Sequence, residues 1–276
     1  MNGPVIGECK LCLRDPVVLE NSHFLSAGIY RQLRDENGAN PNPWLVTSRS
    51  AVQTSRQMTA HLLCRDCEKR FSNGGERWVL TRCSKKDGTF PLASVLSSRI
   101  PDLSSSESQT KVYFAARIPK IDISALAYFA ASIFWRGSIY GWDTDGSVPV
   151  KLGPFPEQFR RYRMGSGPFP LDSRLWIAVR EGKKFDRVTY PPCGGRIDKV
   201  HVYKFPMPGL AFTLTVSKNI PDTFKNMCFV SGPGNPIVVT PVVEELILRD
   251  AVKLYQRTQR VYSSRRDDSD HTFRMS

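Results

Sequence analysis

Cys9-Lys10-Leu11-Cys12 and Cys64-Arg65-Asp66-Cys67 are the two stretches of sequence that decide the expected fold of this chain. Each is a Cys-x-x-Cys pair, which lets two thiolates bind one metal ion from a tight turn. Two such pairs complete the tetrahedral shell that Zn²⁺ prefers. We therefore predict that one structural zinc ion is held by Cys9, Cys12, Cys64 and Cys67.

The cysteine count does not favour a disulfide framework. The chain has seven cysteines, and an odd number in a chain of this length without a secretory signal is a poor basis for paired disulfides. The alternative to zinc is that the two Cys-x-x-Cys pairs are unrelated, either redox-active or incidental. Zinc is favoured because the second pair stands where a helix is expected to begin, at Glu68-Lys69-Arg70-Phe71-Ser72.

Composition is that of an ordinary globular protein, with 276 residues of which 41% are hydrophobic and 24% charged. These values exclude wholesale disorder, a collagen-like repeat and a coiled coil. The longest apolar stretch, 123–135, is shorter than the roughly 20 residues that cross a bilayer. No basic region followed by an apolar one marks a secretory signal at the N-terminus. We expect a soluble, cytoplasmic protein with no membrane association.

The net charge of +13 suits a polyanionic partner, and nucleic acid is the commonest one inside cells. The basic surplus is spread along the whole chain and is not held in one tail. Simple solubility charge is the alternative explanation. The oligomeric state is not indicated by the sequence.

The chain divides into four regions by composition and periodicity. Residues 1–85 are predicted to form a zinc-organised unit, and 86–110, which contains Ser104-Ser105-Ser106, a linker or exposed loop. Residues 111–260 are predicted to form an α+β domain with a mostly antiparallel sheet, and 261–276 a polar tail that we expect to be disordered.

Individual elements follow from hydrophobic spacing. Helices are predicted over 24–33, over 123–137 with Asp122 as its cap, and over 244–257. The stretch 154–170 is rich in Pro and Gly and carries Arg160, Arg161 and Arg163. Strands are predicted over 17–19, 111–117, 175–179, 200–205, 210–216, 227–230 and 237–240.

The order of the motifs in 1–85 resembles the HNH endonuclease superfamily in its zinc-stapled, treble-clef form. A Cys-x-x-Cys pair is followed by a short strand ending in Ser22-His23, a variable insert, and Leu62-Leu63 before the second pair and Glu68. The chain is especially similar to a group of uncharacterised bacterial proteins assigned to that superfamily. Further matching residues are Asn40-Pro41-Asn42, Gln53 or Gln57, Phe71-Ser72 and Glu76.

The resemblance implies a fold, an activity and a set of site residues. The fold would be a ββα-like treble-clef module, and the activity would be metal-dependent hydrolysis of phosphodiester bonds in nucleic acid, DNA foremost, in a bacterial or phage protein. His23 would act as general base, and His23, Glu68 and Glu76 would hold a catalytic Mg²⁺ or Mn²⁺. Both ions are hard cations that accept oxygen ligands.

The chain departs from active HNH enzymes at three positions. Glu68 stands where His or Asn is usual, Thr59 stands where an Asn is usual, and Leu25-Ser26 replaces an expected Pro. Glu68 also has a purely structural explanation, because carboxylates are favoured in the first turn of a helix. The alternative function is therefore a catalytically inactive zinc-binding module that binds nucleic acid or a protein partner.

Basic residues surround the second Cys-x-x-Cys pair. Arg65, Lys69 and Arg70 are candidates for contacts with phosphate, which position a nucleic-acid backbone without reading its sequence. The alternative is that they are solvated surface charges.

Overall fold

A computed structural model describes residues 3–34, 41–46, 51–55, 57–142, 150–180, 189–197, 200–218, 220 and 225–242. The predicted helix 244–257, the predicted tail 261–276 and Asn40 lie outside the described residues. The protein is a mixed α+β structure with a cysteine cluster near its N-terminus.

The N-terminal part is built on a three-stranded sheet with the order β1-β2-β5. Its strands are antiparallel and comprise β1 (Ile6–Gly7), β2 (Val17–His23) and β5 (Thr59–Cys64). Between β2 and β5 lie α1 (Ala27–Leu33) and a two-stranded sheet of β3 (Trp44–Val46) and β4 (Ala51–Gln53). The helix predicted from residue 24 begins later because the amide of Phe24 still donates to the carbonyl of Met58.

β5 runs directly into a helical segment that bends against the rest of the protein. The segment consists of α2 (Arg65–Phe71), a kink at η1 (Ser72–Glu76), where Gly75 has a non-helical backbone conformation, and α3 (Arg77–Arg82). A Cβ atom on Gly75 would lie 2.3 Å from the carbonyl oxygen of Ala125, and one on Gly74 would lie 2.1 Å from the ring of Tyr128. Two successive glycines therefore allow this close approach, because any side chain would collide with the neighbouring helix.

The larger part of the chain forms a seven-stranded sheet with the order β6-β7-β12-β8-β11-β10-β9. All neighbours are antiparallel except β12 and β8, so the predicted mostly antiparallel sheet is confirmed. In sheet order, the strands are β6 (Leu103–Ser105), β7 (Thr110–Phe114), β12 (Pro236–Val239), β8 (Ser173–Val179), β11 (Leu210–Val216), β10 (Val200–Met207) and β9 (Cys193–Ile197).

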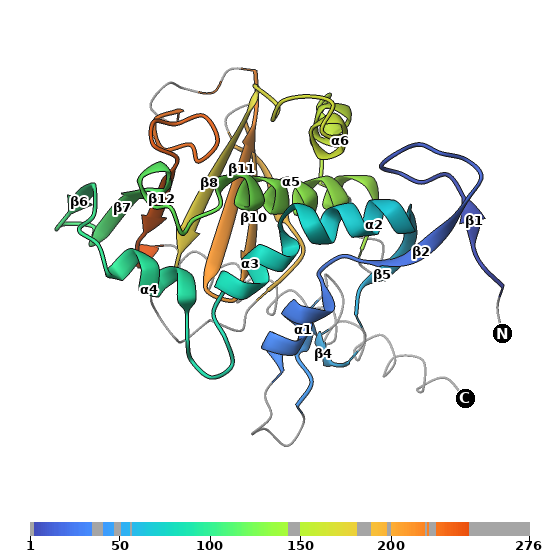
Figure 1. Ribbon diagram of the computed structural model, residues 1–276, viewed down its shortest axis with the longest axis horizontal. Helices are drawn as coiled ribbons and strands as arrows, with labels where there is room; N and C mark the ends of the chain where they lie inside the picture. Colours follow the sequence, from blue (N-terminus) through green and yellow to red (C-terminus); the bar gives the residue numbers. More distant parts are fainter. Residues whose placement is uncertain are drawn as a thin grey trace, which may run out of the picture.

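A long buried helix, α5 (Ile123–Ile139), crosses one face of this sheet in front of β8, β10 and β11 (Figure 1). The Asp122 carboxylate caps it by accepting from the amide of Ala125 at 2.8 Å, as the sequence predicted. The rings of Phe129 and Phe212 lie 5.7 Å apart and join α5 to β11. Nearly every face of α5 is buried because the sheet lies on one side and the α2–η1–α3 segment on the other.

One hydrophobic core runs through both parts of the protein. It extends from Cys9 and Leu11 in the first turn to Val239 in β12. Phe71 of α2 packs against Trp135 of α5, with ring centroids 6.0 Å apart. The N-terminal unit is therefore packed on the larger sheet domain through a shared apolar interior.

The stretch 86–110, predicted as a linker or exposed loop, contains two elements. One is α4 (Pro91–Ser97), whose Leu92 and Leu96 are buried, and the other is β6, whose three residues are exposed. Leu92 and Leu96 are four residues apart and so share one face of a helix, which packs into the core. The Ser-rich composition concealed this short amphipathic element.

Four further stretches differ from the sequence prediction. The stretch 154–170 contains α6 (Pro156–Met164), which starts at a proline and ends at Gly165 with a left-handed φ of 75°. Residues 227–230, predicted as a strand, form turns, and 115–117, predicted to end a strand, form the 3-10 helix η2 (Ala115–Arg117). The edge strand β9 was not predicted, because its Gly194-Gly195 pair is typical of a turn.

Candidate metal centre and the adjoining carboxylate site

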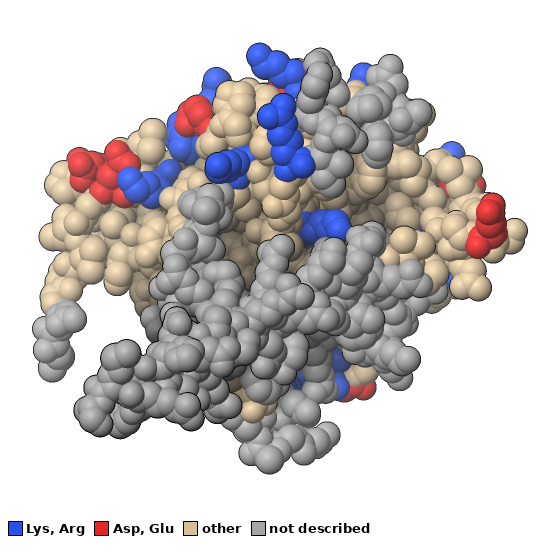
Figure 2. Space-filling view, turned by 180° about the vertical axis from the view of Figure 1, so that it is seen from behind, with Lys and Arg blue, Asp and Glu red and all other residues tan. Residues whose placement is uncertain are grey.

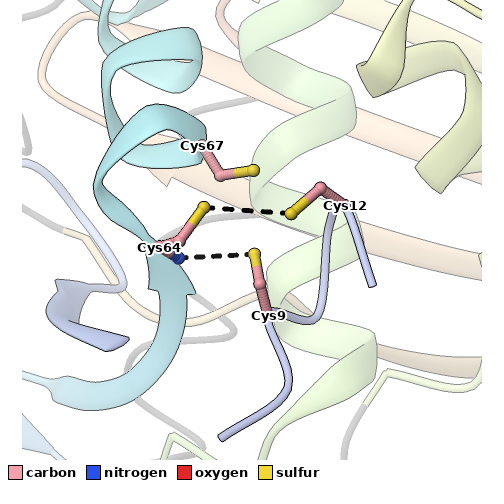
Figure 3. A group of neighbouring side chains, drawn as sticks. All are labelled: Cys9, Cys12, Cys64 and Cys67. Atoms are coloured by element: carbon pink, nitrogen blue, oxygen red, sulfur yellow. Dashed lines mark hydrogen bonds between the residues drawn. The ribbon is translucent and has the colours of Figure 1, made fainter. Parts of the chain in front are cut away.

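The four predicted zinc ligands come together in space. The ligand atoms of Cys9, Cys12, Cys64 and Cys67 all lie within 4.8 Å of one another, and this cluster could hold a metal ion. Figure 3 shows the four sulfur atoms converging from two directions, with Cys9 and Cys12 on a turn and the other two at the junction of β5 and α2. The predicted grouping of these cysteines is confirmed.

Backbone hydrogen bonds shape the first cysteine pair into a tight knuckle. The amide of Leu13 donates to the carbonyl of Cys9 at 2.8 Å, and Leu13 adopts a left-handed φ of 61°. The amide of Lys10 donates to the carbonyl of Leu62 at 2.9 Å, which fixes the knuckle to β5. Backbone hydrogen bonds alone therefore position the first cysteine pair next to the second.

The sulfur atoms form a close, partly buried set. Cys12 Sγ lies 3.8 Å from Cys64 Sγ, and Cys9 Sγ accepts from the amide of Cys64 at 3.3 Å. A hydrogen bond from Cys67 to Cys9 lowers the pKa of Cys9 to about 4, and the same contact raises the pKa of Cys67. Four convergent thiol groups are a donor set for thiophilic cations, and their chemistry fits Zn²⁺.

The contacts that two arginines make next to the cluster were not predicted from the sequence. Arg14 donates to the sulfur atoms of Cys12 and Cys64, and Arg160 of α6 donates to the carbonyl of Leu11 at 2.7 Å. Both contacts of Arg160 with Glu157 are short, at 2.6 and 2.7 Å, so the guanidinium is held in place. Arg160 could not have been found from the sequence, because it is 149 residues from Leu11.

His23 and Glu68 lie on adjoining elements, with Glu68 directly after Cys67 and His23 at the opposite end of the β2–β5 pair from Cys64. His23 is half-buried, ends β2 and pairs in register with Thr59 of β5. Glu68 lies on α2, where it interacts electrostatically with His23 and accepts a hydrogen bond from Ser22. The structure thus brings together the residue at the strand end and the residue on the helix that the sequence singled out.

The Glu68 carboxylate is poorly solvated. Burial raises the pKa of Glu68, and the nearby Arg136 and the hydrogen bond from Ser22 partly oppose this rise. Its Oε1 atom is buried and has no hydrogen-bond partner. A buried carboxylate oxygen without a partner costs free energy unless it acquires a cationic or donor ligand. This orphaned atom fits a cation-binding role for Glu68.

Glu76 is engaged by an arginine of the larger domain. Arg136 Nη1 lies 2.9 Å from Glu76 Oε1, and it also donates to the carbonyl of Phe24 at 3.0 Å. Arg136 lies over the ring of Phe71, with its Cζ atom 4.1 Å from the centroid. Among the described residues, His23, Glu68 and Glu76 do not gather into a tight ligand set of the kind that the cysteines form.

The three basic residues predicted to contact nucleic acid are all exposed on α2. Arg70 also donates to the carbonyl of Met164 at 3.4 Å, which joins α2 to α6. Arg163, in contrast, is fully buried against the rings of Phe71 and Tyr128, and burial lowers its pKa to about 9. On the opposite side of the molecule, Lys and Arg side chains of the described residues lie in separate groups (Figure 2).

No family model, curated protein or solved structure matches this chain. Among the described residues, no helix has both the length and the apolar character needed to cross a bilayer.

Proposed function

We propose that this protein is a metal-dependent nuclease of the HNH type that hydrolyses phosphodiester bonds in nucleic acid, DNA foremost. The observation that carries the proposal is the placement of Glu68 beside His23, with one buried carboxylate oxygen that has no hydrogen-bond partner. A general base and a cation-binding carboxylate on adjoining elements are the groups that phosphodiester hydrolysis needs.

In this proposal the cysteine cluster binds a structural Zn²⁺, and the N-terminal unit is a treble-clef module. The knuckle, the β2–β5 pair and α2 follow one another in the order of the ββα arrangement in that superfamily. All seven cysteines are free thiols in the structure, which suits a reducing, cytoplasmic setting and leaves the cluster able to bind metal.

The side chains have separate roles in the proposed reaction. His23 takes the proton from the attacking water. Glu68 would hold Mg²⁺ or Mn²⁺, which would supply electrostatic stabilisation of the charge that develops on the phosphate. The exposed Arg65 and Lys69 bind the flanking phosphates. Glu76 keeps Arg136 in place through their ion pair and interacts electrostatically with Glu68.

A plasmid-nicking assay tests the proposal. Purified protein with Mg²⁺ or Mn²⁺ is expected to nick supercoiled plasmid, and His23→Ala is expected to abolish nicking while leaving zinc content and circular dichroism unchanged. His61→Ala is the matched control, because His61 is exposed on the neighbouring strand β5 and its ring hydrogen-bonds the backbone carbonyl of Leu19. Cleavage that persists in His23→Ala contradicts the assignment of the base.

The alternative is a catalytically inactive module that binds nucleic acid or a protein partner. The ion pair between Glu76 and Arg136 favours it, because Arg136 already occupies Oε1 of one of the three predicted metal ligands. Absence of cleavage of DNA and RNA with every divalent metal tested, together with salt-dependent binding of duplex DNA, would support this alternative.

A further inference from the structure

Arg14 lies at the outer side of the cysteine cluster and contacts both cysteine pairs. Its Nε donates to Cys12 Sγ at 3.4 Å, and its Nη2 donates to Cys64 Sγ at 3.3 Å. Cys12 belongs to the first knuckle and Cys64 to the second, so one guanidinium spans the two halves of the cluster. The same Nη2 also donates to Asp66 Oδ2 at 2.8 Å, which orients the group.

We propose that Arg14 compensates the negative charge of the metal centre and links the two cysteine pairs through its hydrogen bonds to Cys12 and Cys64. The proposal rests on metal binding by the four cysteines. A divalent cation bound by four thiolates leaves a complex with a net charge of about −2. N–H donors aimed at the sulfur atoms stabilise that charge, and the rigid fork of an arginine can serve two acceptors at once.

The exposure of the residues indicates which sulfur atoms need this protection. Cys9 and Cys67 are buried, whereas Cys12 is only half-buried. Arg14 therefore contacts Cys12, the most exposed residue of the cluster, together with the buried Cys64. Hydrogen bonds to a coordinated thiolate withdraw electron density from sulfur, so they slow attack by electrophiles on the metal-loaded protein.

The contact also explains how the site can assemble. Outer ligands that orient metal-binding side chains typically change metal affinity by about 10- to 100-fold when they are removed. Arg14 links residues that are 50 positions apart in sequence through its bond to Cys64. It thereby reduces the conformational freedom that the two pairs lose when a cation binds.

The test is a comparison of Arg14→Gln with Lys10→Gln in the full-length protein. Lys10 lies within the same knuckle and is also exposed, but it pairs with Glu8 and not with sulfur. Both substitutions remove one positive charge, so they separate the sulfur contacts from net charge. Arg14→Lys retains the charge and loses the two-pronged donor.

Binding of Co²⁺ is measured by its absorption spectrum, and Zn²⁺ affinity by competition with a chelator. We expect Arg14→Gln to retain the spectrum of a four-thiolate complex, to bind Zn²⁺ about 10-fold more weakly, and to react several-fold faster with iodoacetamide when metal-loaded. Arg14→Lys should fall between the two, and Lys10→Gln should match the wild type.

Two results would overturn the proposal in distinguishable ways. Equal affinity and equal alkylation rates for Arg14→Gln and Lys10→Gln refute the role of Arg14 while leaving the metal centre intact. Failure of the wild-type protein to give a four-thiolate Co²⁺ spectrum refutes the metal centre, and the role of Arg14 with it.

Discussion

The guanidinium of Arg136 and the carboxylate of Glu76 form an ion pair of 2.9 Å, with side-chain exposures of only 2% and 12%. The pair joins α5 to η1. The same arginine also donates a hydrogen bond to the carbonyl of Phe24, the residue that follows His23. Both partners are shielded from water, so loss of either one leaves the other as an uncompensated buried charge. This costs more free energy than the loss of one partner of a surface ion pair. It is the electrostatic link between the large sheet domain and the candidate site.

Glu76→Gln should destabilise the protein by about 3–5 kcal/mol, because it leaves the buried charge of Arg136 without a counter-charge. Urea unfolding followed by circular dichroism measures this change. Glu8→Gln is the control, since the Glu8–Lys10 pair is exposed and its loss should cost less than about 1 kcal/mol. Recovery of stability in the double variant Glu76→Gln/Arg136→Met would identify the unpaired charge as the cause, and equal effects of the two single substitutions would contradict it.

Glu68→Gln should raise the thermal stability of protein free of Mg²⁺ and Mn²⁺ at neutral pH, and abolish nicking. Burial raises the pKa of Glu68 in the folded state, so the folded protein binds a proton more tightly than the unfolded chain. Wild-type stability therefore falls as pH rises from the ordinary carboxyl range through the raised pKa, and it recovers as pH falls.

This pH dependence should be smaller in Glu68→Gln. The measurement is Tm against pH by scanning calorimetry, with exposed Glu20 of β2 changed to Gln as the control. A lower Tm for Glu68→Gln than for the wild type at neutral pH would contradict this prediction, because it would show that the buried carboxylate stabilises the fold.

Gly75→Ala should destabilise the protein by about 1–3 kcal/mol, because its Cβ would lie 2.3 Å from the carbonyl oxygen of Ala125 and force η1 away from α5. Gly195→Ala in the edge strand β9 meets no atom within 4 Å and serves as the control. The free energies of unfolding of the two variants decide the matter, and equal values would mean that close contact between η1 and α5 is not required.

Cys64→Ser should remove bound metal and weaken the whole protein in one unfolding transition. The core is continuous from Leu11 to Val239, so loss of the cluster is transmitted to the sheet domain. Metal content by mass spectrometry and calorimetry on the same samples test both parts. Two separate transitions would show that the N-terminal unit melts independently, and stoichiometric zinc in the variant would refute a four-thiolate site.

Replacement of Arg65 and Lys69 by Ala should weaken binding of duplex DNA and lower the slope of log K against log salt by about one for each phosphate that is no longer neutralised. Both side chains are exposed on α2. Fluorescence anisotropy over a range of salt concentrations gives the slope, and Lys120→Ala is a control because that exposed lysine precedes α5 at a site outside the proposed interface. An unchanged slope would remove α2 from the interface.

The sequence by itself determined the elements whose signals are local. The spacing of Cys9, Cys12, Cys64 and Cys67 predicted a cluster that the structure contains. The Asp122 cap and the continuous apolar run predicted α5, and runs rich in β-branched and aromatic residues predicted β8, β10 and β11. These signals are readable because periodicity, capping and knuckle spacing act within a few residues of the chain.

Only the tertiary structure decided which charged residues support the site. Arg136 and Glu76 are 60 positions apart, and Arg160 lies 149 positions from the knuckle that it contacts. No spacing rule predicts such contacts, because they depend on how α5 and α6 pack against the N-terminal unit. The short helix α4 was missed for the same reason, because its stability comes from burial of Leu92 and Leu96 in the core. The exposed strand β9 was missed because its Gly194-Gly195 pair is typical of a turn, whereas pairing with β10 stabilises it.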